Sequence, residues 1–270
     1  MKNNELNNFK FNKKYGQNFI FDTNLLCAIV KDSKINKNDE VLEIGTGAGT
    51  LTLQISNVAK KVISYEIDKN LKDFLLEKFQ KIHNVEIVFQ DALKADLNEI
   101  EDKFNEKYHI IANLPYYITT PLIFKFIASQ KVASLTVMVQ KEVAQRMVAN
   151  IGTKDYGILS VMLAFYSDVN ITRIVNRKIF YPVPNVDSAV VHIAKKPTPC
   201  DEKLFSKVVH ASFSMRRKTI LNNLSSSLKL DKQTVSSWLE KCNISSDKRA
   251  EQLALEDFVN LCKSYFDINS

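Results

Sequence analysis

The sequence has little of what disulfide-bonded, metal-binding or membrane-spanning proteins need. Its 270 residues include only 4 cysteines, which form no C-x-x-C pair: Cys27, Cys200, Cys242 and Cys262. The 4 histidines are isolated and fit no metal-ligand spacing. No apolar run approaches the roughly 20 residues of a membrane span, and residues 1–14 lack the apolar core of a secretory signal. We therefore expect a cytoplasmic protein in a reducing compartment, with no metal and no membrane partner.

Positive charge, in contrast, is in excess. The net charge of +7 favours a polyanionic partner such as nucleic acid. Basic and aromatic residues are interleaved over residues 9–15, a pattern that suits contacts with a nucleic-acid backbone and its bases. A solvated, lysine-rich tail is the alternative interpretation, and charge alone does not exclude it.

Short apolar runs alternate with helical spacing in the first half of the chain. We predict strands at residues 41–44, 62–65, 85–89, 109–112 and 135–139, with helices between them. This alternation predicts an α/β fold in which helices cover both faces of a mostly parallel sheet.

The pattern changes after residue 140. Residues 158–166 predict a helix, although a strand also fits, and residues 169–175 and 189–194 alternate like strands. Residues 195–199 have the composition of a linker, and the apolar spacing is helical from residue 204 to the end. We therefore predict two domains, residues 1–198 and a small all-α domain at residues 199–270.

Glycines follow the first predicted strand and precede a helix. The segment Gly45–Gly49 reads G-x-G-x-G, and glycines let a ligand approach the backbone. Thr50 stands where the nicotinamide fingerprint G-x-G-x-x-G needs its third glycine. Glu66 and Asp91 end the next two strands, where carboxylates can accept hydrogen bonds from the ribose hydroxyls and the amine of an adenosine. These three strand ends predict a site for an adenosine cofactor, either a dinucleotide or S-adenosylmethionine.

The tetrapeptide Asn113-Leu114-Pro115-Tyr116 follows the fourth predicted strand. The amide of Asn113 offers two donors and two acceptor lone pairs at a strand end, and the ring of Tyr116 can stack on a flat ligand. This pairing suits a flipped base whose exocyclic amine reacts. A strand that ends in a simple proline turn is the alternative.

The same tetrapeptide resembles the N-[L/I]-P-Y form of the signature of rRNA adenine N6-dimethyltransferases. The E-x-G-x-G-x-G spelling of Glu43–Gly49 resembles class I S-adenosylmethionine-dependent methyltransferases. Further segments resemble that dimethyltransferase family: residues 15–19, 140–144, 156–160, 180–188 and 213–218. The resemblance implies a class I methyltransferase fold with a Rossmann-like, doubly wound sheet. It also implies an S-adenosylmethionine-binding catalytic domain and a helical rRNA-recognition domain.

The activity implied by this resemblance is S-adenosylmethionine-dependent N6,N6-dimethylation of two adjacent adenosines. The adenosines lie in a hairpin loop near the 3′ end of 16S rRNA, and the partner is the immature small ribosomal subunit. A role in small-subunit biogenesis would accompany this activity. We expect a monomer.

The resemblance also implies roles for individual residues. The implied cofactor-binding residues are Asn18, Ile20 (through its backbone), Gly45, Gly47, Glu66, Asp91 and Asn113. The implied catalytic residues are Asn113, Leu114, Tyr116 and Phe180, with the rings of Tyr116 and Phe180 on the two faces of the flipped adenine. Asn185 stands where many relatives have lysine, which weakens the expectation of a phosphate contact there. Residues 213–218 imply a basic helix that could contact RNA.

Three other functions stay open. A 23S rRNA adenine N6-methyltransferase conferring macrolide resistance would share the signature, but Leu114 and residues 180–188 and 213–218 favour the small-subunit type. A mainly RNA-binding ribosome assembly factor would not need the Glu66, Asp91 and Asn113 set. A nicotinamide oxidoreductase would need a glycine in place of Thr50 and an acid for hydride chemistry.

Overall fold

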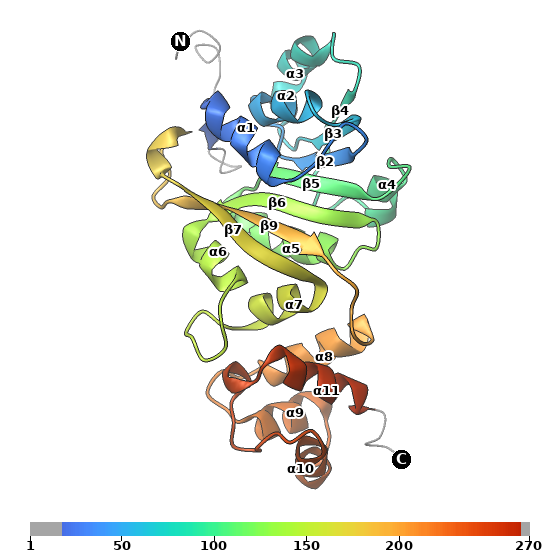
Figure 1. Cartoon of the computed structure of the whole chain (residues 1–270), viewed down its shortest axis with the longest axis vertical. Helices are drawn as coiled ribbons and strands as arrows, with labels where there is room; N and C mark the ends of the chain where they lie inside the picture. Colours follow the sequence, from blue (N-terminus) through green and yellow to red (C-terminus); the bar gives the residue numbers. More distant parts are fainter. Residues whose placement is uncertain (1–17, 266–270) are drawn as a thin grey trace. The chain divides into compact units, whose positions relative to one another are not determined.

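A computed structural model describes residues 18–265 of the chain. The interleaved basic and aromatic residues 9–15, and residues 15–17 of the family-like segment, lie outside the described residues. Strands and helices alternate over the first half of the described chain as predicted (Figure 1). This half contains β1 (Phe19–Ile20), α1 (Thr23–Asp32), β2 (Glu40–Ile44), α2 (Thr50–Ser56), β3 (Lys61–Tyr65), α3 (Lys72–Phe79), β4 (Val85–Val88), α4 (Leu97–Glu101), β5 (Tyr108–Asn113), α5 (Thr119–Ile127) and β6 (Val132–Gln140). One-turn 3-10 helices cover Lys69–Leu71 (η2) and Tyr116–Ile118 (η3).

The second half of the described chain supplies two further long strands and then only helices. It contains α6 (Lys141–Met147), α7 (Ile158–Tyr166), β7 (Ser167–Val175), η4 (Arg177–Ile179), β8 (Phe180–Tyr181), β9 (Ser188–Lys195), α8 (Glu202–Ser212), α9 (Ile220–Leu228), α10 (Lys232–Lys241), η5 (Ala250–Gln252) and α11 (Leu255–Lys263). The ambiguous residues 158–166 are helical, and the strands predicted at residues 169–175 and 189–194 are confirmed. No helix within residues 18–265 is long and apolar enough to cross a membrane.

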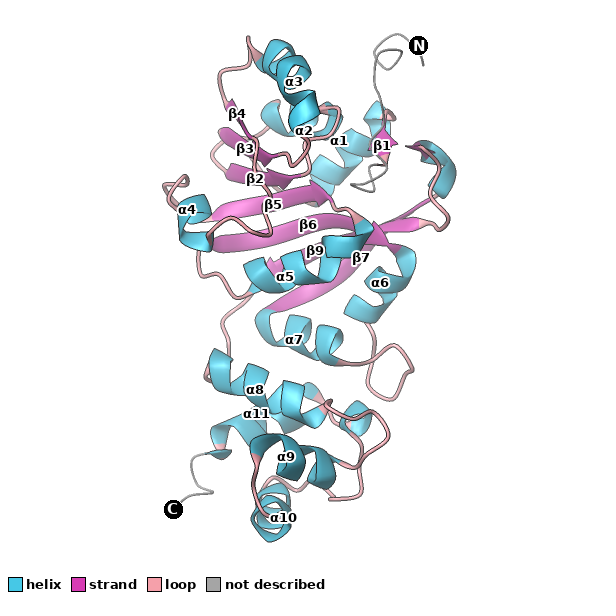
Figure 2. Ribbon diagram, turned by 180° about the vertical axis from the view of Figure 1, so that it is seen from behind, coloured by secondary structure: helices cyan, strands magenta, loops and turns pink. Residues whose placement is uncertain are grey.

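Seven strands form one sheet in the order β4-β3-β2-β5-β6-β9-β7. The neighbours from β4 to β6 are all parallel, which confirms the predicted α/β fold. All residues of β2 are buried, as expected for a central parallel strand that is covered on both faces. Helices α1 and α2 cover one face and α5 covers the other, as the opposite views of Figures 1 and 2 show.

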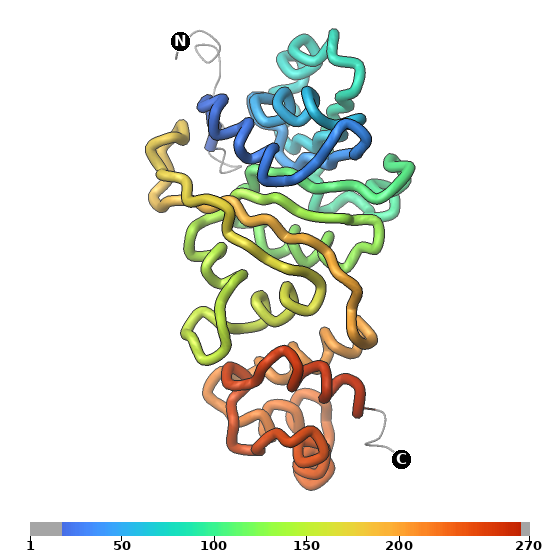
Figure 3. The backbone as a smooth tube through the Cα atoms, viewed as in Figure 1, coloured from blue at the N-terminus to red at the C-terminus, as the bar shows by residue number. Residues whose placement is uncertain are grey.

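A second, two-stranded sheet connects distant parts of the sequence. Strand β1 pairs with β8 in antiparallel register, so that Phe19 lies opposite Tyr181 and Ile20 opposite Phe180. Each strand has only two residues, which is too short for a periodicity signal, and the sequence did not predict this pairing. Figure 3 traces the chain from β7 through residues 176–187 and back into β9.

The chain divides into two compact units, and the division differs from the predicted boundary at residue 198. One unit consists of Met1–Lys141 and Ile171–His192, and the other of Glu142–Asn170 and Ile193–Ser270. Helix α7 belongs with the C-terminal helices because it is buried on nearly all sides, and Phe165 stacks on Phe205 of α8 with 3.7 Å between ring centroids. The sequence boundary relied on the linker composition of residues 195–199, which carries no information about the packing of α7.

The expectation of a basic helix at residues 213–218 is wrong, because these residues form a turn. Arg216, Arg217 and Lys218 lie in the turn between α8 and α9. Helix α8 ends at Ser212, where the side-chain amide of Asn223 donates hydrogen bonds to the carbonyl oxygens of Ser212 at 2.6 Å and Met215 at 3.1 Å. These bonds satisfy carbonyl groups that a continuing helix would have used.

Candidate active site

The glycine loop between β2 and α2 forms one wall of a pocket. Gly45, Gly47 and Gly49 have φ angles of +87°, +56° and +71°, a region that side chains of L-residues rarely adopt. A Cβ atom on Gly47 would lie 3.1 Å from the ring of Phe19, and one on Gly49 would lie 2.6 Å from the ring of Phe79. Both the backbone angles and the lack of space therefore require glycine in this loop.

Glu66 follows β3 and lies at the base of this wall. Its side chain is buried, and its two carboxylate oxygens accept hydrogen bonds from the backbone N–H groups of Gly47 at 2.7 Å and Asp68 at 2.8 Å. Burial raises the pKa of the Glu66 carboxyl, while these two hydrogen bonds oppose the rise. A carboxylate has about four lone-pair sites, so these bonds leave acceptor capacity for a ligand.

A second carboxyl group, Glu43, lies beneath the loop in β2. It is fully buried, and its Oε2 accepts hydrogen bonds from Thr52 Oγ1 and Ser64 Oγ, each at 2.6 Å. Its Oε1 is buried without a hydrogen-bond partner among the described residues. Burial raises the pKa of Glu43 to about 8. Ser64 also shares a hydrogen bond with Thr46, so this buried network reaches a residue that lines the pocket.

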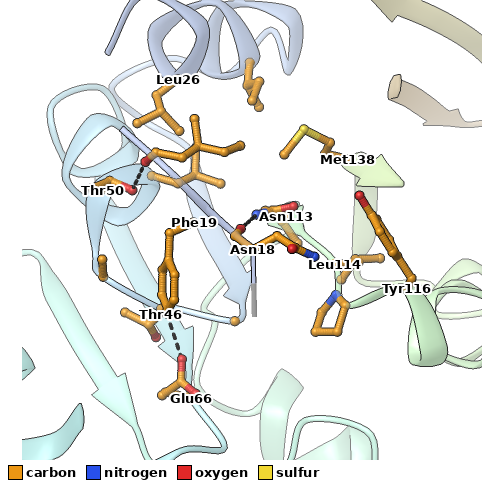
Figure 4. A pocket seen from close by; sticks show the side chains of 18 of the residues that line it. Asn18, Phe19, Leu26, Thr46, Thr50, Glu66, Asn113, Leu114, Tyr116 and Met138 are labelled. Atoms are coloured by element: carbon orange, nitrogen blue, oxygen red, sulfur yellow. Dashed lines mark hydrogen bonds between the residues drawn. The ribbon is translucent and has the colours of Figure 1, made fainter. Parts of the chain in front are cut away.

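Asn113 is the last residue of β5 and lies in the opposite wall (Figure 4). Its Nδ2 donates a hydrogen bond to the backbone carbonyl oxygen of Asn18 at 2.9 Å. Because the amide is planar, this bond fixes its orientation and leaves Oδ1 as the atom that can accept from a second partner. The backbone N–H of Leu114 donates to Met138 in β6 at 3.2 Å, so the chain stays attached to the sheet as it enters the tetrapeptide.

Tyr116 is half-buried and continues this wall. Its hydroxyl group shares a hydrogen bond of 2.8 Å with Ser188 Oγ at the start of β9. Burial raises the pKa of the Tyr116 phenol, which therefore stays neutral. The bond to Ser188 restricts the rotation of the ring.

The structure brings most of the predicted site residues together. Eight of them line this single pocket: Asn18, Ile20, Gly45, Gly47, Glu66, Asn113, Leu114 and Tyr116. In the view of Figure 4, Phe19 and Asn18 lie between Glu66 and the tetrapeptide. Segments from four parts of the sequence thus meet at the carboxyl ends of β2, β3 and β5, where ligands bind in open α/β sheets.

Two predicted site residues do not line the pocket. Asp91 lies in the loop after β4, where its Oδ1 accepts a hydrogen bond from the backbone N–H of Leu93 at 2.9 Å. Phe180 is only 2% exposed and packs in the hydrophobic core with Ile20 and Leu26. In this structure Phe180 therefore does not form the expected second face for a base, because its strand β8 turns Phe180 inward and Tyr181 outward. Roles for both residues stay predictions.

The chain shows clear similarity to rRNA-modifying enzymes. The sequence model of the ribosomal RNA adenine dimethylase family matches residues 8–267. The chain belongs to this family. It is 43% identical over 258 residues to the ribosomal RNA small subunit methyltransferase A of Clostridioides difficile, with 93% of this chain and 89% of the relative covered. Identity to the enzyme of the same name from Bacillus cereus is 42% over 267 residues, with 94% and 90% covered.

Solved structures of adenine dimethylases and their relatives have the same fold. A dimethyladenosine transferase from Plasmodium falciparum is 29% identical, with a TM-score of 0.79 and coverage of 93% of this chain and 98% of that one. The 23S rRNA methyltransferase ErmE is 26% identical, with a TM-score of 0.70 and coverage of 91% and 98%. These similarities confirm the class I methyltransferase fold.

Sequence reasoning missed several residues that hold the site of this adenine dimethylase in place. Thr50, considered only as a departure from the nicotinamide fingerprint, donates from Oγ1 to the carbonyl oxygen of Ile20 at 2.9 Å. Ser188 holds Tyr116, and its position at the end of the family-like residues 180–188 was the available signal. Lys125 in α5 holds the Asp91 loop through backbone carbonyls, and no motif in the sequence marks it.

Proposed function

We propose that this protein dimethylates N6 of two adjacent adenosines in a hairpin loop near the 3′ end of 16S rRNA. The observation that supports this proposal is the shared pocket of Asn113–Tyr116, the glycine loop and Glu66. A cofactor wall and a base-accepting wall facing one cavity suit group transfer to a flipped base.

The residues of the glycine-loop wall fit S-adenosylmethionine, which supplies an electrophilic methyl group. Gly45 and Gly47 have no side chains, so a ligand can approach the backbone of the loop closely. Glu66 keeps acceptor capacity for the ribose hydroxyls, and Ile20 and Asn18 border the same cavity. Asp91 would accept a hydrogen bond from the adenine amine of the cofactor. Within residues 18–265 no cluster of three or more His, Cys, Asp or Glu side chains could hold a metal ion.

The residues of the Asn113 wall act on the target amine. The lone pair of adenine N6 is delocalised into the ring, so the planar amine is a poor nucleophile. Asn113 Oδ1, oriented by the bond to Asn18, and the backbone carbonyl of Leu114 accept hydrogen bonds from the N6–H groups and favour a pyramidal nitrogen, which loses a proton once methyl transfer has made it cationic. These hydrogen bonds strengthen as positive charge develops on N6, so they stabilise the transition state more than the ground state. Tyr116 stacks on the base, a contact worth roughly 1–3 kcal/mol.

The biological substrate is the immature small ribosomal subunit, which the protein meets as a monomer in the cytoplasm. The positive net charge of +7 supports binding to rRNA. We assign the helical C-terminal part of the chain, predicted as residues 199–270, to rRNA recognition, with Arg216–Lys218 exposed in the turn between α8 and α9. Methylation of 16S rRNA in the immature subunit makes the protein part of small-subunit biogenesis.

Methyl transfer to immature small subunits tests this proposal. We expect labelled methyl groups from S-adenosylmethionine to appear in 16S rRNA, with two adjacent N6,N6-dimethyladenosines identified by mass mapping. Large subunits and free 23S rRNA serve as controls. Methylation of 23S rRNA instead would support the macrolide-resistance activity, and specific subunit binding without methyl transfer would support an assembly factor.

A further inference from the structure

Exposed apolar side chains are concentrated in one short segment next to the pocket. The described residues include 8 large hydrophobic side chains that are exposed: Leu76, Tyr117, Ile151, Ile174, Tyr181, Val183, Val186 and Met215. Three of these side chains lie within Tyr181–Asp187, which we call the rim segment, and a fourth, Tyr117, directly follows the pocket-lining Tyr116. Scattered single apolar side chains on a surface need no explanation, whereas three within one short segment call for one.

Both ends of the rim segment are anchored at residues that line the pocket. At its start, Tyr181 lies opposite Phe19 in the β1–β8 pair, and Phe19 is a pocket residue. Directly after its end, Ser188 binds the hydroxyl group of the pocket residue Tyr116. The backbone N–H of Lys141 also donates to the carbonyl oxygen of Asp187 at 3.0 Å. The rim segment therefore borders the pocket and is held there at both ends.

The apolar side chains of the rim segment are exposed, although the residues that flank it, Phe180 and Ser188, are buried. Tyr181 is 54% exposed, Val183 56% and Val186 43%, whereas Phe180 is 2% exposed. Positive charge lies beside these apolar groups. Arg177 donates from its guanidinium to the carbonyl oxygen of Asn185 at 2.9 Å, and Lys178 is exposed next to it. Aromatic and aliphatic surfaces together with basic groups fit single-stranded RNA better than an acidic or apolar protein surface.

We infer that the rim segment binds the nucleotides that flank the target adenosine, and that the ring of Tyr181 stacks on one of them. This inference rests on the proposed function, because it assumes that an RNA base enters the pocket. A base that leaves its stack exposes the faces of its neighbours, and an aromatic ring at the pocket border can cover one of those faces. Stacking of this kind is independent of sequence and holds the strand while the target adenosine is in the pocket.

Fluorescence of 2-aminopurine tests this inference without turnover. The probe replaces, in two separate RNA hairpins, the nucleotide before or after the two target adenosines. We expect the wild-type protein to quench at least one probe, the Tyr181→Phe variant to retain the quenching, and the Tyr181→Ala variant to lose it. Hairpin Kd should rise about fivefold or more for Tyr181→Ala, as expected for one lost stacking contact.

Leu76→Ala is the matched control, because Leu76 is 49% exposed on α3, which is remote from residues 176–187 in Figure 1. It should change neither quenching nor hairpin affinity. Affinity for S-adenosylhomocysteine should be equal in all three variants, which excludes damage to the cofactor wall. Equal quenching by Tyr181→Ala and the wild type, or no quenching by the wild type, would overturn the inference. The proposed function fails separately, if the wild type binds small subunits and transfers no methyl group to 16S rRNA.

Discussion

The two walls of the pocket differ in the sequence separation of the residues that hold them in place. The glycine loop and Glu66 belong to one continuous stretch from β2 to β3, and the buried side chains beneath them come from the same stretch. The Asn113–Tyr116 wall depends on distant partners, since Asn113 binds Asn18, 95 residues earlier, and Tyr116 binds Ser188, 72 residues later. The buried hydrogen bonds beneath the glycine loop and Glu66 are thus mostly local in sequence, whereas those that hold Asn113 and Tyr116 span most of the first unit.

Replacement of Asn113 tests the distant wall and should have the largest effect. Asn113→Ala removes the acceptor Oδ1, and the loss of one oriented hydrogen-bonding group costs about 2.7–4 kcal/mol in transition-state stabilisation. We expect kcat for methyl transfer to fall by about 10²–10³-fold. Affinity for S-adenosylhomocysteine, measured by calorimetry, should fall far less than kcat, because Glu66 and the glycine loop are untouched. Turnover equal to that of the wild type would contradict the assigned role of Asn113.

The buried carboxyl group beneath the local wall makes stability depend on pH. The pKa of Glu43 is about 8 in the folded chain, compared with 4.5 as its ordinary value, so the folded state binds more protons between these values. The free energy of unfolding therefore falls as pH rises from about 4.5 to about 8. Glu43→Gln resembles the protonated carboxyl group and keeps an acceptor for Thr52 and Ser64.

Urea unfolding across this pH range measures the effect of Glu43→Gln. The variant should gain stability relative to the wild type as pH rises, by up to about 1.4 kcal/mol per pH unit. Glu40→Gln in the same strand is the control. Both carboxylate oxygens of Glu40 accept a hydrogen bond, from the Asn105 side chain at 3.1 Å and the Asn105 backbone at 2.9 Å, whereas Oε1 of Glu43 accepts none from the described residues. Unfolding free energies of wild type and Glu43→Gln that run parallel with pH would show that Glu43 is not protonated in the folded chain.

These two walls also explain which parts of the site the sequence could reveal. The G-x-G-x-G spacing, Glu66 and Asn113 follow strands whose apolar runs are visible in the sequence, so their meeting at one sheet edge was predictable. The pairing of β1 with β8 was not, because strands of two residues have no periodicity and the pairing is set by tertiary packing. That pairing decides that Phe180 is buried and Tyr181 exposed.

Gly49 and Gly152 differ in the space around them, although their backbone conformations are alike. Gly49 and Gly152 have similar φ angles, +71° and +79°, but a Cβ atom would lie 2.6 Å from Phe79 at Gly49 and would meet nothing within 4 Å at Gly152. Gly49→Ala should therefore destabilise the protein by about 1–3 kcal/mol more than Gly152→Ala, because only the first overpacks the core. Thermal unfolding of both variants measures the difference. Equal losses would mean that α3 moves aside without cost.

Replacement of Lys125 tests whether the cofactor side of the pocket also depends on residues that are distant in the sequence. Its ammonium group, on α5, donates to the carbonyl oxygens of Ala92 at 2.8 Å and Leu93 at 3.1 Å, and also to that of Ala95. These carbonyls belong to the loop after Asp91, so a cofactor-side loop depends on a helix that follows the tetrapeptide. Burial lowers the pKa of Lys125, and the nearby Asp91 carboxylate opposes this shift.

Lys125→Met keeps the length of the side chain and removes the three donated hydrogen bonds. We expect the Kd for S-adenosylhomocysteine to rise about fivefold, equivalent to about 1 kcal/mol, because the Asp91 loop loses its fixed position. The 6-deamino analogue, which has no adenine amine for Asp91, should bind wild type and variant equally. A purely stabilising role for Lys125 predicts a lower Tm with the same change for both ligands. Asp91→Asn is the second variant to compare. If it binds S-adenosylhomocysteine more weakly while Lys125→Met binds it as the wild type does, the result would support a contact between Asp91 and adenine. It would also show that Lys125 is not needed for that contact.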